Sequence, residues 1–594
     1  MYQANEKRDE IIEKIIAHIK KKLPAKQAQL VCEFTRQYYA NLALNDLLTR
    51  SSDDWYGVVL SHWNFAAQRG ETECKVRVYN PNYAEHHWQS NHTVIEISDK
   101  DKPFLVDSTR MAISQAGIGM HLMINLGGIK VARDAAGQII QVFPKDAELP
   151  AGAVSEALIH IEIDKQTDPV ILEQLSLKIE HTLADVRIAV EDWAAMRTRV
   201  EETIEELEKN PPPFDSENIE ESKNFLRWML DNHFTFLGAR DYILTKETLD
   251  VVPGTGLGIL RDERKGRLSR PLSELAPSAV EVALGPQVLI ISKTNTVSTV
   301  HRPTHADYIG IKRFDKKGKL IGERRFIGLY TSVAYNSNPS EIPFLRQKVA
   351  AIMKRSGFPP KGHAAKALYN IVETLPRDDL FQGSVEELFE MAMGILSLQE
   401  RSIIRLFVRK DVYGRFISCL VYMPRERVHT DLREAMGKIL LHAFGGSEIS
   451  FVTQFSESIL ARVHFIIRVN PNIPVTYDTE AIQAKLVDAA RSWNDELHHR
   501  LIEYYGEEKG NELNAKYGRA LPPGYRDDFD PRTAVYDIEY LERLSDKNRL
   551  EMNLYRSLDD TDGSVRLRLY QPNHAIPLSD VLPMLENMGL RVLA

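Results

Sequence analysis

Residues 93–124 have the pattern of a strand, a short charged loop, a helix, a glycine and a second strand. The helical stretch at 103–116 ends at Gly117, where glycine can take the left-handed conformation that closes a helix without a Cβ clash. The same helix–glycine–strand pattern returns at 576–594 with Gly589. Because the apolar face of a helix must be buried against another element and strands flank this helix, a unit of this kind favours layered domains of mixed helix and strand.

Further short β-type runs surround this unit. From residue 74 to 195 the predicted order is strand–helix–strand–strand–helix–strand, with the second helix at 168–184 and a last short strand at 187–190. This order is typical of the split βαβ, or ferredoxin-like, sandwich. Residues 1–65 are predicted to be helical, with isoleucines spaced to form one apolar face.

The rest of the chain divides at proline-rich linkers. Three consecutive prolines at 211–213 stop any helix and mark a domain boundary. Beyond them we expect a β-rich domain at 219–335, a helical connector at 339–400, a second split βαβ sandwich at 401–506 and a third at 532–594. The predicted fold class is a multidomain α+β chain. The apolar run from Leu590 stops after a few residues, and an unpaired edge is unfavourable, so the pattern predicts a longer polypeptide truncated here.

Composition restricts the partners. The net charge of −8 gives no support to a nucleic-acid partner. The three cysteines lie far apart, which favours a reducing cytoplasm. No uninterrupted apolar run is long enough to span a bilayer. The amphipathic N-terminal helix mixes both charge signs on its polar face, which favours packing on its own protein over a membrane.

Motifs of catalysis are not found. The glycines of "PGTGLG" at 253–258 lack the spacing and the following helix of a dinucleotide fingerprint, so a turn is predicted. The histidine pairs at 86–87, 301 and 305, and 498–499 have no third ligand at metal-site spacing. We therefore predict no catalytic residue, no cofactor-binding residue and no metal ligand in this chain.

Two places are candidates for binding a small effector. The first is the loop before the helix at 103–116, which contains Asp101, Lys102 and Phe104. Amide N–H groups at a helix start attract anions, but the loop has two aspartates and two lysines, so its charge preference stays open. The second is a set of arginines, because guanidinium groups bind carboxylates bidentately: Arg409, Arg415 and Arg425. Solvated ion pairs on a strand pair are the favoured alternative there.

Several long blocks resemble the large bacterial NAD-specific glutamate dehydrogenases from about residue 30 onward. Among them are "FLRWMLDNHFTFLGARDY", "RLFVRKDVYGRFISCLVYMPRER" and "PLSDVLPMLENMGLRVL". The resemblance implies ACT-like domains for the three sandwiches, a PAS-type central segment and helical motifs, followed by a catalytic core outside this chain. It implies a non-catalytic regulatory and oligomerisation region of an enzyme that oxidatively deaminates L-glutamate to 2-oxoglutarate. NAD would then be bound by that core, and the partners would be the core, further copies of the chain and a small effector.

One departure from the family pattern concerns the effector loop. The ligand-binding ACT motif usually has Asp-x-Pro-Gly, whereas this chain has Phe104 at the glycine position. Phe104 is expected to fill the space that an effector would use. A stand-alone amino-acid sensor and a pure assembly scaffold are the alternative functions.

Overall fold

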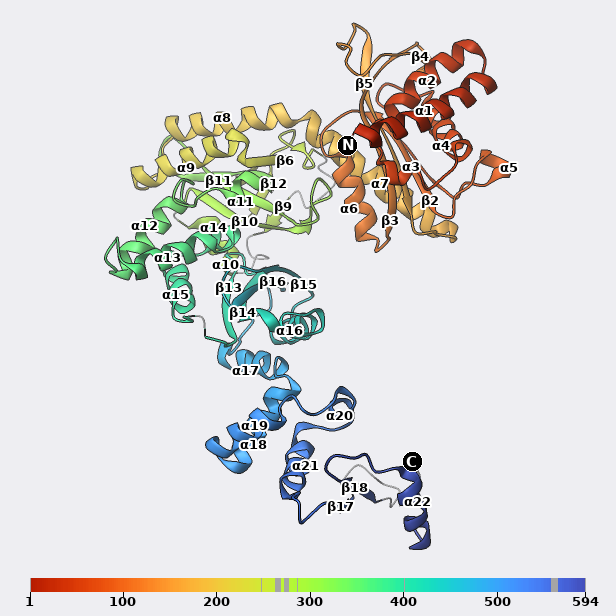
Figure 1. Cartoon of the computed structure of the whole chain (residues 1–594). Helices are drawn as coiled ribbons and strands as arrows, with labels where there is room; N and C mark the ends of the chain where they lie inside the picture. Colours follow the sequence, from red (N-terminus) through yellow and green to blue (C-terminus); the bar gives the residue numbers. More distant parts are fainter. Residues whose placement is uncertain are drawn as a thin grey trace. The chain divides into compact units, whose positions relative to one another are not determined.

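The structure is a computed structural model, and it describes residues 2–246, 248–261, 269–271, 277–285, 287–399, 401–556 and 565–592 (Figure 1). The chain forms two compact units. The first comprises Met1–Gln399, Val408–Ser418 and Arg468–Pro474, and the second comprises Glu400–Phe407, Cys419–Ile467 and Val475–Ala594. Among the described helices, none combines the length and the apolar character that crossing a membrane requires.

Helices occupy the start of the first unit: α1 (Tyr2–Lys22), α2 (Ala25–Tyr39), α3 (Leu44–Leu47) and α4 (Ser52–Ala66). The isoleucine face of α1 is buried, with Ile15 and Ile19 fully inaccessible. Helix α4 begins at a capping box. The Ser51 side chain accepts a hydrogen bond from the Asp54 amide, and the Asp54 carboxylate accepts one from the Ser51 amide. These helices share one core with a face of the first sheet.

The first sheet has the order β1-β2-β5-β3-β4, and every neighbouring pair is antiparallel. Its elements are β1 (Lys75–Tyr79), α5 (Tyr83–His86), β2 (Thr93–Lys100), α6 (Leu105–Gln115), β3 (Met120–Arg133), β4 (Ile139–Val142), β5 (Ala153–Ile163) and α7 (Pro169–Glu191). Ile97 and Ile161 lie on the face that packs against α6 and α7. The alternate residues of the same strands lie on the opposite face, towards the N-terminal helices.

The expected strand at 187–190 is wrong, because α7 continues through it to Glu191. Leu175, Ile179, Val186 and Ala189 are buried at helical spacing, so one apolar stripe runs the whole length of α7. Strand β1, which precedes β2 in the chain, occupies the edge position beside β2. The first domain is therefore a split βαβ sandwich whose edge strand comes at its start.

A second antiparallel sheet follows, with seven strands in the order β10-β11-β12-β6-β7-β9 and β8 paired to β6. Its elements are α8 (Trp193–Lys209), α9 (Ser216–Trp228), β6 (Phe234–Leu244), β7 (Thr248–Val251), β8 (Leu257–Gly258), β9 (Ser269–Pro271), α10 (Pro277–Leu284), β10 (Leu289–Val297), β11 (His305–Phe314) and β12 (Leu320–Tyr330). The turn at 316–319 joins two paired strands, β11 and β12. Leu237 and Leu329 of this sheet and Val300 of the β10–β11 loop join the core of β2, β5, α6 and α7.

The helical connector consists of α11 (Ser332–Asn336), α12 (Leu345–Ser356), α13 (His363–Thr374), α14 (Arg377–Gln382) and α15 (Val385–Leu396). The next sheet has the order β13-β14-β16-β15. Its elements are β13 (Arg405–Lys410), β14 (Phe416–Pro424), α16 (Thr430–Ala443), β15 (Glu448–Gln454), β16 (Leu460–Arg468) and α17 (Thr479–Ala489). The edge strand β13 comes before the other strands of its sheet in the chain, as β1 does in the first domain. Helix α17 ends at Ala489, and Ser492 caps a separate helix, α18 (Trp493–Tyr505).

The last elements are α19 (Glu507–Tyr517), α20 (Pro523–Asp528), α21 (Pro531–Arg543), β17 (Glu551–Tyr555), β18 (Arg566–Tyr570) and α22 (Leu578–Asn587). The order β17, β18, α22 matches β13, β14, α16 of the second sandwich and, apart from the short helix α5, β1, β2, α6 of the first. Gly117, Gly445 and Gly589 follow the corresponding helices with φ of 71°, 61° and 81°, so the left-handed helix ends predicted at Gly117 and Gly589 are confirmed. Residues 590–592 form no strand, and residues 593–594 lie outside the described residues.

Candidate functional site

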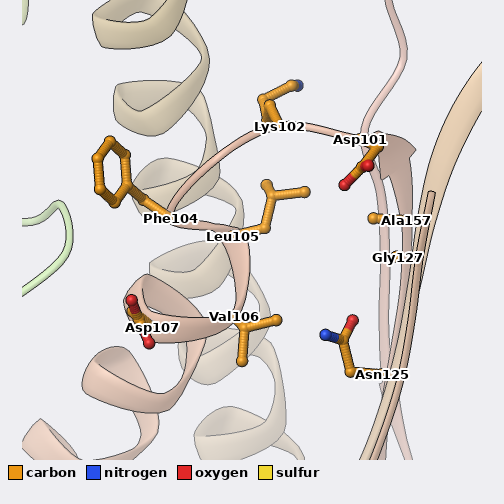
Figure 2. Close-up of a pocket in the computed structure, with 9 residues that line it drawn as sticks. All are labelled: Asp101, Lys102, Phe104, Leu105, Val106, Asp107, Asn125, Gly127 and Ala157. Atoms are coloured by element: carbon orange, nitrogen blue, oxygen red, sulfur yellow. The ribbon is translucent and has the colours of Figure 1, made fainter.

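A pocket of about 180 Å³ opens in the first domain between the start of α6 and strands β3 and β5 (Figure 2). Its lining consists of Asp101, Lys102, Phe104, Leu105, Val106, Asp107, Asn125, Gly127 and Ala157. The three loop residues predicted as effector ligands, Asp101, Lys102 and Phe104, are all among them. This is the position at which a split βαβ sandwich presents the N–H groups of a helix start to a ligand.

The backbone of the loop is held in place at both ends. The Asp101 amide donates to the Ser155 carbonyl of β5 at 2.9 Å, which fixes the exit from β2. Phe104 precedes α6 with φ 71° and ψ 0°, a left-handed conformation that a non-glycine residue rarely adopts. The family pattern has glycine at this position, and the chain keeps the glycine-like turn although the residue is phenylalanine.

The expectation that Phe104 fills the pocket is wrong. Figure 2 shows its ring turned away from Asn125 and Ala157. The ring lies instead against His301, with 5.0 Å between the ring centroids. His301 belongs to the loop between β10 and β11, and its amide donates to the Ser108 hydroxyl at 3.0 Å. Because a neighbouring domain takes up the phenyl ring, the space at the helix start stays open.

An ion pair within the loop bears on the charge preference that the sequence left open. The Lys102 ammonium donates to the Asp99 carboxylate at 2.8 Å, and the two side chains are only 9% and 4% exposed. The Lys102 ammonium is therefore paired with Asp99, and Figure 2 shows it pointing away from Asn125. Asp101 remains as a carboxylate in the lining, opposite the Asn125 carboxamide. This wall favours a ligand ammonium group.

The other end of the pocket presents the backbone amides of a helix start, and the acidic side chain there, Asp107, lies 3.2 Å from the His301 ring. Helix α6 receives no hydrogen bond from its N-cap side chain, and the residues of its first turn, Leu105, Val106 and Asp107, line the pocket. N–H groups at a helix start have no partner within the helix and carry partial positive charge. A pocket with a carboxylate wall and an amide end is complementary to a small zwitterion. Sequence reasoning missed Asn125, which β3 brings to the loop, and Asp107, which lies in the first turn of α6.

The predicted arginines do not line this pocket. Arg409 donates to the Asp379 carboxylate at 2.9 and 2.7 Å, and both side chains are buried. Arg415 donates to the Ser292 hydroxyl at 2.9 Å. Arg425 is exposed and donates to the Ser456 carbonyl at 3.4 Å. Arg409 and Arg415 therefore bond to Asp379 and Ser292, which belong to the same compact unit.

In the described residues, one group of side chains has the spacing of a metal site. Nitrogen and oxygen atoms of His62, Glu96 and His160 lie within 4.8 Å of one another, and all three side chains are buried. Both ring nitrogens of His62 are already bonded, Nδ1 to the Tyr38 hydroxyl at 2.8 Å and Nε2 to the Ile97 carbonyl at 3.2 Å. Glu96 is paired with an arginine, so we assign this group to a hydrogen-bonded network of the protein.

The fold and the pocket define a class of protein: a chain of repeated split βαβ sandwiches, the first with a ligand-sized opening at a helix start, as in ACT-like regulatory domains. Family models give the particular family. Residues 34–179 match the glutamate dehydrogenase ACT1 domain, 342–401 helical motif 1, 405–494 the ACT2 domain, 500–544 helical motif 2 and 549–594 the ACT3 domain. The chain is thus built from domains of the glutamate dehydrogenase family.

Whole-chain relatives agree with the domain matches. The chain is 40% identical over 99% of its length to an NAD-specific glutamate dehydrogenase of Halomonas elongata, and 39% identical over 94% to one of Pseudomonas aeruginosa. It is 27% identical over 82% of its length to one of Mycobacterium tuberculosis. The chain spans 37%, 35% and 30% of the length of these three proteins.

Proposed function

We propose that this chain is the N-terminal regulatory and oligomerisation region of an NAD-dependent glutamate dehydrogenase. The whole enzyme would convert L-glutamate, NAD and water to 2-oxoglutarate, ammonia and NADH. The support is that two NAD-specific glutamate dehydrogenases align with almost the whole chain. The chain covers about a third of their length. We assign the catalytic core and the NAD site to the remaining part, and this stretch is then non-catalytic.

The pocket of the first domain is the proposed effector site. The observation that carries this proposal is the open space at the start of α6, where the Asp101 carboxylate faces the amides of the first helical turn. An α-amino acid would place its ammonium group at Asp101 and Asn125 and its carboxylate at the helix start. Regulation requires a coupling free energy between this pocket and the catalytic core, typically about 1–3 kcal/mol.

Assembly and the central sheet complete the proposal. A homo-oligomer is supported by β15, an edge strand on which Phe451 and Val452 are 44% and 67% exposed. Such an edge pairs readily with another strand. The PAS-type class of the central sheet is supported by its order, in which the first strand, β6, lies between the second, β7, and the last, β12.

Two measurements test the proposal. Purified residues 1–594 should form no NADH from glutamate and NAD, whereas robust turnover would show that a catalytic core is present in this chain. Isothermal titration of the same protein with a panel of amino acids should give binding by at least one. Asp101→Asn should weaken that binding, and Asp134→Asn, an exposed aspartate in the turn after β3, serves as the matched control.

The same titration separates the alternatives. Binding without any effect on the activity of the full-length enzyme favours a stand-alone sensor. Uniform absence of binding together with concentration-dependent association favours a pure assembly scaffold.

A further inference from the structure

The face of the first sheet beneath the N-terminal helices contains buried charge. Glu96 of β2 and His160 and Glu162 of β5 are all fully inaccessible. Glu96 and His160 are directly opposed in the antiparallel register, and Glu162 lies two residues further along β5 on the same face. Apolar side chains would pack there without a desolvation penalty, so the charges need a specific arrangement to be tolerated.

Each carboxylate has an arginine partner. Arg77 of β1 pairs with Glu96, which also accepts from the Tyr79 hydroxyl at 3.1 Å. Arg50, in the connection before α4, donates to Glu162 through both terminal nitrogens, one of them at 2.6 Å. The Arg50 pair joins the helical segment directly to the sheet.

His160 lies between these two ion pairs. Its Nε2 is 3.3 Å from Glu162 Oε1, and its Nδ1 is 3.7 Å from Glu96 Oε1. A neutral imidazole has one N–H, whereas the imidazolium has an N–H on each nitrogen and can face a carboxylate on both sides. The rings of His62 from α4 and of Trp88 face His160 at centroid distances of 6.2 Å each.

The groups around His160 favour its protonated form. Burial opposes the charge, but the hydrogen bonds and charges of Glu162 and Glu96 outweigh it and raise the pKa of His160 above its usual value. Burial lowers the pKa of His62 to about 4, which keeps that ring neutral between the Tyr38 hydroxyl and the Ile97 carbonyl. The pKa of Glu96 falls to about 2 because its partners outweigh its burial, so it stays ionised.

We propose that His160 stabilises the packing of the N-terminal helices on the first sheet in a pH-dependent way. When protonated, it joins the Arg50–Glu162 and Arg77–Glu96 pairs into one continuous network under α4. A histidine whose folded pKa is raised contributes its full stabilisation below the ordinary histidine pKa, and this contribution is lost as the pH rises through the folded pKa. The helices α2 and α4 are therefore held most tightly on the acidic side and loosen on the alkaline side.

Hydrogen exchange of the full 594-residue chain from about pH 5.5 to about pH 9, corrected for the intrinsic pH dependence of exchange, tests this device. We expect the protection of α2 and α4 to fall with rising pH relative to α7, by roughly tenfold per unit of pKa shift. Protection of α2 and α4 that follows α7 at every pH would overturn the proposal.

Variants and a direct titration make the test specific. His160→Gln should abolish the pH dependence at α2 and α4. His121→Gln should retain it, because His121 is an exposed histidine of the same sheet paired with Asp164 at 2.7 Å. NMR titration of 13C-labelled histidines in the wild-type chain should give His160 a pKa above 6.5. A value at or below 6.5 would also overturn the proposal, and this measurement decides the matter even if His160→Gln does not fold.

Discussion

Replacing Phe104 by alanine and by glycine distinguishes the packing of the phenyl ring from the strain of the left-handed backbone. Both changes remove the half-buried ring from His301, a loss of about 1–2 kcal/mol of packing free energy. Only glycine also relieves the left-handed conformation at φ 71°, which costs an L-residue about 1–2 kcal/mol. Phe104→Gly should therefore be close to wild type, and Phe104→Ala should be less stable than Phe104→Gly by about 1–2 kcal/mol.

This order is the reverse of the usual one, because glycine is normally about 0.5–1 kcal/mol less stable than alanine within regular structure. The assay is the free energy of opening of the α6 amides from native-state hydrogen exchange, which reports local stability in a multidomain chain. Ser114, an exposed helical residue of α6, is the control, and there the alanine variant should be the more stable one. If Phe104→Ala were as stable as Phe104→Gly, the left-handed turn would not be an inherent constraint of the loop.

Two further predictions concern buried charges. Arg409→Met should destabilise the first unit by about 3–5 kcal/mol in urea unfolding, because Asp379, whose side chain is 1% exposed, loses its arginine. Arg355→Met breaks an ion pair whose side chains are 48% and 64% exposed, and a loss above about 1 kcal/mol there would contradict the reasoning. Burial lowers the pKa of Lys312 to about 8, so the unfolded state binds more protons between that pH and the ordinary lysine pKa. Stability should consequently rise across this range relative to Lys312→Met, by up to about 1.4 kcal/mol per pH unit, and parallel pH profiles of the two proteins would refute it.

Local patterns predicted most of the elements of the first domain. The helix expected at 103–116 is observed at Leu105–Gln115, since its apolar spacing and its terminal glycine both act within the element. The run at 187–190 was assigned to a strand because four residues with two β-branched side chains do not distinguish a strand from the end of a buried helix. The edge strand that pairs with β2 could equally precede β2 or follow α7 in the chain. Only the tertiary pairing of strands decides between these two positions.

The candidate site was predictable in its location but not in its chemistry. The loop position of Asp101 and Lys102 follows from the fold pattern, and both line the pocket. Whether Lys102 is available to a ligand depends on its ion pair with Asp99, three residues earlier. The sequence does not show to which face of the sheet the end of β2 directs the Asp99 carboxylate. The direction of the Phe104 ring depends on His301, almost two hundred residues away, which no local pattern contains.

The contact between Phe104 and His301 also bears on how an effector signal would leave the pocket. His301 lies next to Val300, which is fully buried in the core that α6 and α7 share with the central sheet. Asp107, in the pocket lining, is 3.2 Å from the His301 ring, so two residues at the start of α6 contact the same loop. Packed cores change between discrete arrangements and do not deform continuously, so a shift of the α6 start on ligand binding must move this loop with it. The central sheet is therefore the first element outside the sandwich that can respond to the occupancy of the pocket.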